Sequence, residues 1–299
     1  MRGDTVISKA RENIMRLVFF IAALASILAV ILICVFLFAQ GLPAISKIGA
    51  KEFLLGTKWA PTKSEPAFGI LPMILGSVYV TAGAILLGVP IGIFMAIFMA
   101  RMCPKPIYRL IKPAINLMAG IPSVIYGFFG MMVIVPAVFE IFGKRYDMMS
   151  GDTMLAASII LGIMILPTVI NIAETNIRAV PQELYEGAIA LGASHERAVF
   201  KVVLPAAGSG VMAAVVLGVG RAIGETMAVN MVAGNQPVLR LPYDFLKGVR
   251  TMTANIIIEM GYVEHGSLHN GALIATGVVL FVFILIINII FSLLNHDER

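Results

Sequence analysis

The chain has 299 residues and a formal net charge of +5, with 13% charged and 59% hydrophobic residues. Soluble domains carry about a quarter charged residues, so this balance predicts a polytopic membrane protein. The positive charge is spread along the sequence and forms no basic patch, which argues against a nucleic-acid-binding protein. The isolated cysteines Cys34 and Cys103 predict neither a disulfide framework nor a metal site.

The first expected span is residues 17–39, which contain no charge. Such a stretch is longer than the core of a signal peptide, which is about 7–15 residues, so we expect it to be retained. Residues 1–16 carry four basic residues among apolar residues at helical spacing, a pattern typical of an amphipathic tail on a membrane surface. Residues 40–72 form an outer, polar loop.

Five further spans are expected, which makes the fold an all-α membrane protein with six transmembrane helices. A short basic loop and a long polar loop interrupt them at 101–113 and 236–270. Pro90 predicts a kink, Gly88 and Gly92 a close-packing face, and the Gly-Ile-Pro at 120–122 a break. The expected spans are residues 73–100, 114–142, 154–173, 206–235 and 271–295, and the core transmembrane domain is 73–295.

A polar insert at residues 181–205 separates the fourth and fifth spans and is expected to form two short helices. Pro181 suits the start of the first helix, Gly192 its end, and Ser194 the N-cap of the second. Leu184, Ala188 and Leu191 share one face of the first helix. An apolar face placed in water favours a groove on a partner, although it could also cover the protein's own helices.

The insert resembles the EAA loop of ABC importer permeases. The resemblance rests on Glu186, Gly187 and Ala188, on Gly192 six residues after the glutamate, and on VVLP at 202–205, with Gly187 in place of the usual alanine. In that family the loop is a coupling helix held in a cleft of a cytoplasmic ATPase. The resemblance therefore implies the type I importer permease fold, which is MetI-like, and ATPase contacts at Glu186, Gly187, Ala188, Leu191 and Gly192.

The distribution of basic residues sets the expected orientation. The N-terminal tail, the 101–113 loop, the insert with the preceding Arg178, and the C-terminal tail hold 12 Lys and Arg residues, against 9 on the other side. The N-terminal tail and the 101–113 loop are short and dense in basic residues. We therefore expect both termini and the insert in the cytoplasm. An insert that contacts an ATPase requires the same side.

The expected fifth span contains two charged residues, Arg221 and Glu225. A charge at the centre of a bilayer costs about 2.5–3.5 kcal/mol on insertion scales, so such residues usually face a partner or a wet path. Because they are spaced i, i+4, the two could pair and serve only helix packing. The alternative is an anion path in which the Arg221 guanidinium binds an oxyanion and Glu225 accepts the proton of hydrogen phosphate, which sulfate lacks.

The same segment carries a second resemblance, to PstC-type permeases of bacterial phosphate importers. It rests on GRAIGETMAV at 220–229 followed by Gly-Asn at 234–235, on AGIPSVIYGFFG at 119–130, and on WAP and FGILP between 59 and 72. The resemblance implies transport of inorganic phosphate along a path that includes Arg221, Glu225, Thr226 and Asn230. It also implies a complex with the sister permease PstA, two PstB ATPases and the periplasmic phosphate-binding protein PstS, in the cytoplasmic (inner) membrane.

Other candidate sites have ordinary explanations. We expect Glu174 and Arg178 to be solvated at the headgroup level, although they could instead help to hold the insert against the helix bundle. We expect His265 and His269 to be loop residues rather than metal ligands, since no third ligand follows. No phosphate-binding P-loop motif and no catalytic motif is present. The chain is therefore expected to be a non-catalytic subunit without a cofactor of its own, with ATP and magnesium on the partner ATPase.

Two alternatives to a phosphate importer remain open. A permease for another oxyanion, such as sulfate or molybdate, would have the same architecture. A stand-alone secondary anion transporter or channel would also explain the charges of the fifth span. It would not need the insert, so co-purification of a soluble ATPase distinguishes it.

Overall fold

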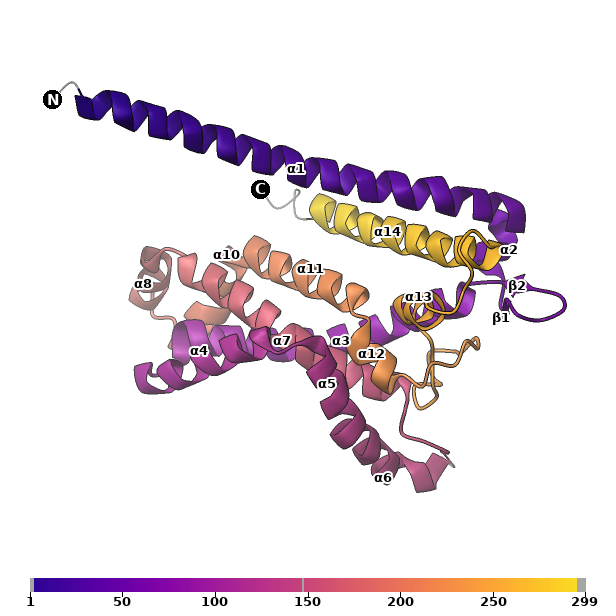
Figure 1. The fold of residues 1–299 in the computed structure, drawn as a ribbon. Coiled ribbons are helices and arrows are strands. Elements are labelled where there is room, and N and C mark those ends of the chain that lie inside the picture. The colour runs from indigo at the N-terminus through magenta and orange to yellow at the C-terminus, as the bar shows by residue number, and fades with distance from the viewer. Residues whose placement is uncertain (1–2, 147, 295–299) are drawn as a thin grey trace.

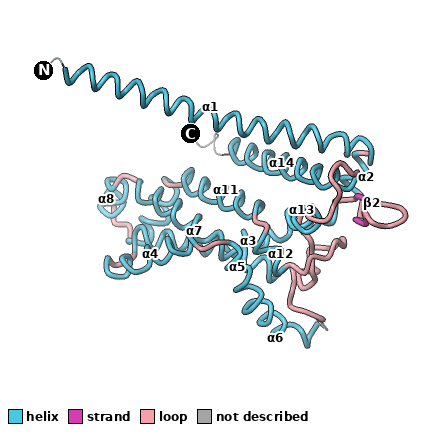
Figure 2. The backbone as a smooth tube through the Cα atoms, viewed as in Figure 1, coloured by secondary structure: helices cyan, strands magenta, loops and turns pink. Residues whose placement is uncertain are grey.

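A computed structural model describes residues 3–146 and 148–294, which are helical apart from one short β-hairpin and the loops (Figure 2). The side chains of residues 1–10, which carry much of the expected amphipathic pattern, lie outside the described residues, as does the end of the chain from 295. Five described helices are long and apolar enough to cross a membrane. A sixth span results if the helices on either side of Ala207, which meet at 71°, are counted together.

The first layer consists of α1 (Gly3–Ile48) and α14 (Leu268–Leu294), which lie side by side although they come from opposite ends of the sequence (Figure 1). The Phe38 and Phe281 rings meet edge to face at 6.1 Å. A Cβ on Gly41 would lie 2.7 Å from Val278, so the backbones approach closely here. Because α1 is one continuous helix, the expected tail and first span form a single element rather than two.

The second layer is built on α3 (Leu71–Ile97) and α7 (Met154–Ala179), the most extensive helix contact in the described chain. A Cβ on Gly88 would lie 2.7 Å from the Gly162 carbonyl oxygen, and one on Gly92 would lie 2.8 Å from Val169. The expected packing face of these two glycines is therefore confirmed. The helices can approach closely because α3 carries no side chain at these two positions.

The third expected span differs from the structure in its limits. The break at 121–122 is present, but the helix before it, α4 (Lys105–Gly120), includes much of the expected basic loop. The apolar span lies after the break and runs from Ser123 to Tyr146. It comprises α5 (Ser123–Phe129), the π-helix η2 (Gly130–Ile134) and α6 (Val135–Tyr146). A second π-helix, η1 (Phe98–Met102), extends α3 toward α4.

The insert and the fifth span are divided into short helices. The insert contains two helices and a π-helix: α8 (Gln182–Ala190), α9 (His195–Ala198) and η3 (Val199–Val203). The bend at Ala207 separates α10 (Leu204–Ala206) from α11 (Gly208–Gly224), and α12 (Met227–Val232) follows a second break.

The opposite end of the molecule from the insert carries the remaining small elements (Figure 1). They are α2 (Ala50–Leu55), the antiparallel strands β1 (Trp59–Ala60) and β2 (Ala67–Phe68), and α13 (Met252–Glu259). In the β-hairpin Trp59 pairs with Phe68. Phe53, Ile70 and Leu273 are buried beneath it, so α2, the hairpin and α14 share one apolar core.

We predict that Gly88→Ala lowers the thermal stability of the purified protein in detergent. The new methyl group would meet backbone and the Ile165 side chain, and such overpacking costs about 1–3 kcal/mol. Gly120→Ala is the control, because nothing lies within 4 Å of its added Cβ. An unfolding midpoint that is equal for both variants would contradict this account of the α3–α7 contact.

Candidate functional site

The candidate site is the break between α11 and α12. The helix ends at Gly224, Glu225 is extended (φ −70°, ψ 130°), and Thr226 caps the next helix at φ −118°, ψ −57°. The expected continuous span 206–235 is therefore two helices with non-helical backbone between them. Within a membrane protein, irregular backbone is tolerated where it is enclosed by protein or lines a cavity. Broken helices of this kind form substrate sites in transporters.

Arg221 lies in the last turn of α11, where the helix dipole favours a cation. Its side chain is exposed, and its Nη1 donates a hydrogen bond to Oγ1 of Thr168 on α7 at 3.0 Å. The expected ion pair with Glu225 is not formed, because the chain leaves the helix before Glu225 and the i, i+4 spacing no longer applies. Arg221 thus keeps a full positive charge beside a neutral hydroxyl.

Glu225 turns toward α12 instead. Its Oε1 accepts a hydrogen bond from the backbone N of Ala228 at 3.3 Å, so the carboxylate caps the helix. Its backbone carbonyl accepts one from Oγ1 of Thr253 on α13 at 3.2 Å. The hydroxyl of Thr226 donates to the Gly224 carbonyl at 3.3 Å. The break is therefore held by its own side chains and by α13.

Asn230 lies one turn into α12 and presents a buried side-chain oxygen, Oδ1, that has no hydrogen-bond partner among the described residues. Its backbone carbonyl accepts a hydrogen bond from Nδ2 of Asn235 at 2.7 Å. Asn235 and the preceding Gly234 both have positive φ, at 51° and 77°, which explains a Gly-Asn pair at this turn.

The two broken spans meet each other. A Cβ on Gly127 of α5 would lie 3.0 Å from Cα of Ala228 on α12, and one on Gly130 would lie 2.8 Å from Val232. The sequence segments 119–130 and 220–235 therefore form one packed unit. Gly220 and Gly224, spaced i, i+4 on α11, have nothing within 4 Å of an added Cβ in the described chain. That face of α11 is open.

The coupling residues of the insert lie on its surface. Glu186, Gly187, Leu191 and Gly192 are exposed, Ala188 is half-buried, and Leu191 shows 91% of its surface. Their positions follow from local chemistry, because Gly192 ends α8 at φ 86° and Ser194 Oγ accepts a hydrogen bond from the Arg197 amide at 3.3 Å. The expected helix end and N-cap are confirmed.

Sequence reasoning missed a polar cluster at the end of the molecule that carries the β-hairpin. Glu259 on α13 accepts hydrogen bonds from Nε1 of Trp59 at 2.9 and 3.0 Å and from Nη1 of Arg250 at 2.7 Å. Its Oε2 also lies 2.8 Å from Nε2 of His269 on α14. His269 is therefore part of a structural cluster rather than a loop residue, whereas His265 is exposed. The sequence carries only a weak signal for this cluster. The one tryptophan, Trp59, lies in the polar loop 40–72, and Arg250 and Glu259 lie in the other long polar loop, 236–270.

The expectation of solvation is wrong for Glu174, whereas the Arg178 side chain is exposed. Glu174 is 1% exposed and belongs to an ion-pair cluster with Arg178 and Lys112. The four lysines of the 40–72 segment, Lys47, Lys51, Lys58 and Lys63, are exposed. Within residues 11–146 and 148–290, whose side chains are described, no group of three or more His, Cys, Asp or Glu residues could hold a metal ion.

Comparison with known proteins agrees with this arrangement. Residues 88–299 match the family model of the binding-protein-dependent transport system inner membrane component. The chain is 39% identical to the probable ABC transporter permease protein YqgH of Bacillus subtilis, over 93% of this chain and 90% of that protein. It is 35% identical to the phosphate transport system permease protein PstC of Mesorhizobium japonicum, over 92% and 88% of the two chains.

Among solved structures, the chain is similar to the inward-facing MetNI methionine ABC transporter. The TM-score is 0.62 with 18% sequence identity, over 77% of this chain and 96% of that chain. At this identity the likeness shows the fold alone. The expected all-α, MetI-like fold of type I importer permeases is confirmed.

We predict that Ser194→Ala speeds hydrogen exchange of the Arg197 and Ala198 amides without unfolding the rest of the protein. Loss of an N-cap costs about 0.5–2 kcal/mol of helix stability. Ser209→Ala is a matched control, since Ser209 is exposed at the start of α11. Equal exchange at α9 in both variants would show that the Ser194 cap is unimportant.

Proposed function

The chain belongs to the family of binding-protein-dependent transport system inner membrane components, and from this premise we propose that it is the permease subunit of an ATP-driven importer of inorganic phosphate. Support for phosphate comes from the relatives named PstC, which are 31–35% identical over most of the chain. Further support comes from Arg221, whose charge has only a neutral hydroxyl as its partner in the described structure.

The observation that carries the proposal is the position of Arg221 at a helix break. A planar guanidinium with free N–H groups binds two oxygens of an oxyanion at once. Its present partner, Thr168, bonds one Nη1 and leaves the rest of the exposed group available. Burying such a cation in an apolar bundle is costly unless an anion or water reaches it. We therefore assign Arg221 to the substrate path.

Glu225, Thr226 and Asn230 are proposed to complete the path. Hydrogen phosphate carries a proton that it can donate, whereas sulfate has none at neutral pH. The Glu225 carboxylate would accept that proton in a hydrogen bond and would repel sulfate. The unpartnered Oδ1 of Asn230 is a second acceptor in the same segment. Together these two hydrogen-bond acceptors favour a protonated oxyanion, which can donate a hydrogen bond, over an oxyanion such as sulfate that can only accept hydrogen bonds.

The energy for transport is proposed to enter through the insert. Its exposed apolar residues Leu184, Ile189 and Leu191 suit a groove on a soluble ATPase, which would hold ATP and magnesium. The proposed complex contains this chain, the sister permease PstA, two PstB ATPases and the periplasmic protein PstS. It would lie in the cytoplasmic (inner) membrane with both termini and the insert in the cytoplasm. Closure of the ATPases would move the insert and open the path alternately to each side.

We predict that Arg221→Gln lowers phosphate uptake by the complete importer in proteoliposomes at least tenfold, while the subunits still assemble. Glutamine keeps a polar side chain that can donate a hydrogen bond, but it is shorter and lacks the charge that binds the anion. Arg11→Gln, in the exposed first part of α1, is the control and should leave uptake unchanged. Normal uptake by the Arg221 variant would refute the proposed path.

We also predict that Glu225→Gln lowers the preference for phosphate over sulfate by about tenfold, because a hydrogen bond to a charged group contributes about 1.5–3 kcal/mol. The measurement is phosphate uptake in the presence of competing sulfate or molybdate. An unchanged preference would mean that Glu225 only caps α12. If the wild-type importer itself prefers sulfate or molybdate, the substrate is another oxyanion.

A further inference from the structure

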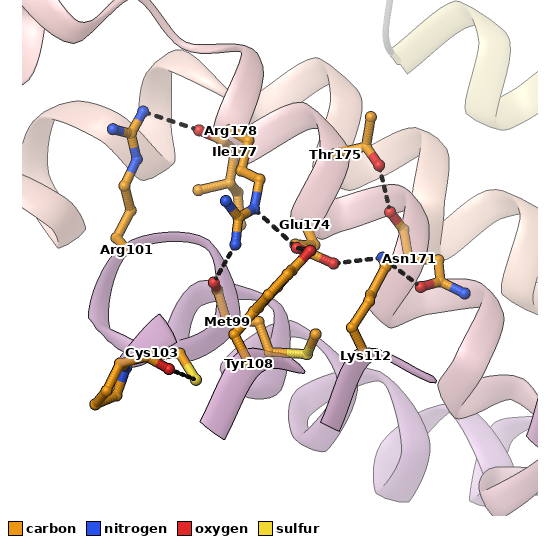
Figure 3. Close-up of polar contacts among 11 residues, drawn as sticks. Met99, Arg101, Cys103, Tyr108, Lys112, Asn171, Glu174, Thr175, Ile177 and Arg178 are labelled. Atoms are coloured by element: carbon orange, nitrogen blue, oxygen red, sulfur yellow. Dashed lines mark hydrogen bonds and ion pairs between the residues drawn. The ribbon is translucent and has the colours of Figure 1, made fainter. Parts of the chain in front are cut away.

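Glu174 is a buried carboxylate on α7 that joins this helix to α4. It accepts hydrogen bonds from Nζ of Lys112 at 2.6 Å, from the Tyr108 hydroxyl at 2.8 Å and from Nε of Arg178 at 2.8 Å (Figure 3). Tyr108 and Lys112 belong to α4, which packs along α7. Removing one member of such a buried cluster leaves another charge uncompensated, so its geometry is strongly constrained.

Arg178 extends the cluster to the end of α3. Its Nη2 donates to the backbone carbonyl of Met99 in η1 at 2.7 Å, and its guanidinium lies 4.4 Å from the centre of the Tyr108 ring. Lys112 also donates to Asn171 of α7 at 2.8 Å. The ends of α3, α4 and α7 nearest the insert are therefore tied together by charged groups.

Arg101 connects this cluster to the insert. Its Nη2 donates to the backbone carbonyl of Ile177 at 3.1 Å, near the end of α7 (Figure 3). The same atom donates to the backbone carbonyl of Val180 at 3.0 Å. The last carbonyls of a helix have no partner within it, so Arg101 satisfies them. Its Nη1 donates to Oε1 of Gln182, the first residue of α8, at 2.9 Å. One planar side chain thus bridges η1, the end of α7 and the start of the insert.

The returning part of the insert is fixed to the same helices by apolar packing. Val199 and Val203 of η3 are fully buried in one cluster with Ala96 and Ile97 of α3 and Ile177 of α7. By contrast, the insert leads into α11 through the 71° bend at Ala207. The insert is therefore joined to η1 by Arg101 and to α3 and α7 by the buried valines of η3, while the Glu174 cluster joins α4 to α7. It leads into α11 only through the corner at Ala207.

We propose that Arg101 and Glu174 are positioning residues that fasten the insert to α3 and α4, so that the insert, α3, α4 and α7 move as one body. This inference rests on the proposed function, since it specifies how movement of an ATPase would reach the membrane helices. The bend at Ala207 and the break at Glu225 would then be the places where the path helices α11 and α12 change their angle.

Arginine is required at position 101 because its planar fork reaches three acceptors at once. Lysine would supply the charge but not the fixed set of N–H directions. The clamp, defined as Arg101, Tyr108, Lys112, Glu174 and Arg178, therefore differs from the neighbouring exposed cations Lys105 and Arg109. These two provide matched controls on the same segment.

The first test compares Arg101→Gln with Arg109→Gln in the complete importer in proteoliposomes. We expect Arg101→Gln to lower phosphate uptake at least tenfold while ATP hydrolysis stays within about twofold of wild type, so that fewer phosphates enter per ATP. Arg109→Gln should change neither rate. A purely structural role predicts that uptake and hydrolysis fall together, and that result, or unchanged uptake, would overturn the proposal.

The second test replaces the clamp by a covalent tie. The double variant Arg101→Cys, Gln182→Cys is made in a background carrying Cys34→Ser and Cys103→Ser. We expect this variant to hydrolyse ATP with little phosphate uptake, and a short bifunctional thiol reagent that links the two cysteines to restore uptake. A monofunctional reagent is the control and should restore nothing. If the tie leaves uptake low, or stops transport in the assembled complex, the insert does not move together with α3 and the proposal fails.

A third measurement is independent of the substrate. Trapping the ATPases with ATP and vanadate should change hydrogen exchange both in the insert and in residues 98–112 of the wild type, but only in the insert of Arg101→Gln. If the wild-type complex hydrolyses ATP without importing phosphate, the proposed substrate is wrong, and this exchange pattern still decides the role of the clamp. An equal change in hydrogen exchange at residues 98–112 in the wild type and in Arg101→Gln would overturn the proposed role of the clamp.

Discussion

Polar groups that leave water in so apolar a chain must find partners within the protein, and this constraint determines where the helices can break. The backbone released at Glu225 and Thr226 is held by the Glu225 carboxylate and by Thr253 of α13. The carbonyls at the end of α7 are held by Arg101. At both places a side chain compensates for the departure from a regular helix, and the break at Glu225 lies where substrate is proposed to pass.

The same constraint distinguishes structural charges from a functional one. Glu174 and Glu259 each accept hydrogen bonds from several donors, so Lys112, Arg178 and Arg250 each have a carboxylate partner. Arg221 has an exposed guanidinium and a neutral partner, Thr168. An anion can therefore bind Arg221 without first breaking an ion pair. Anion binding is therefore more favourable at this guanidinium than at a cation that already has a carboxylate partner.

Much of the fold follows from patterns visible in the sequence: uncharged stretches, the glycines of α3, and the Gly192 and Ser194 signals of the insert. These depend on residues close together in the chain. The clusters around Glu174 and Glu259 depend on contacts between distant segments; Trp59 and Glu259, for example, are 200 residues apart. The break at Glu225 was also missed, because Gly-Glu-Thr has no proline and the flanking residues favour one continuous helix. The i, i+4 spacing of Arg221 and Glu225 suggested a possible ion pair, which the break at Glu225 prevents.

The pairing of α1 with α14 has a consequence for synthesis of the protein. The first helix leaves the ribosome long before the last one exists, so it must enter the bilayer and wait there without its neighbour. Its side chains from residue 11 onward are mostly exposed apolar groups, which allow it to be stable in lipid alone. Assembly of this layer is therefore a late step of biogenesis, and small residues such as Gly41 and Gly271 are what the two helices use to recognise each other.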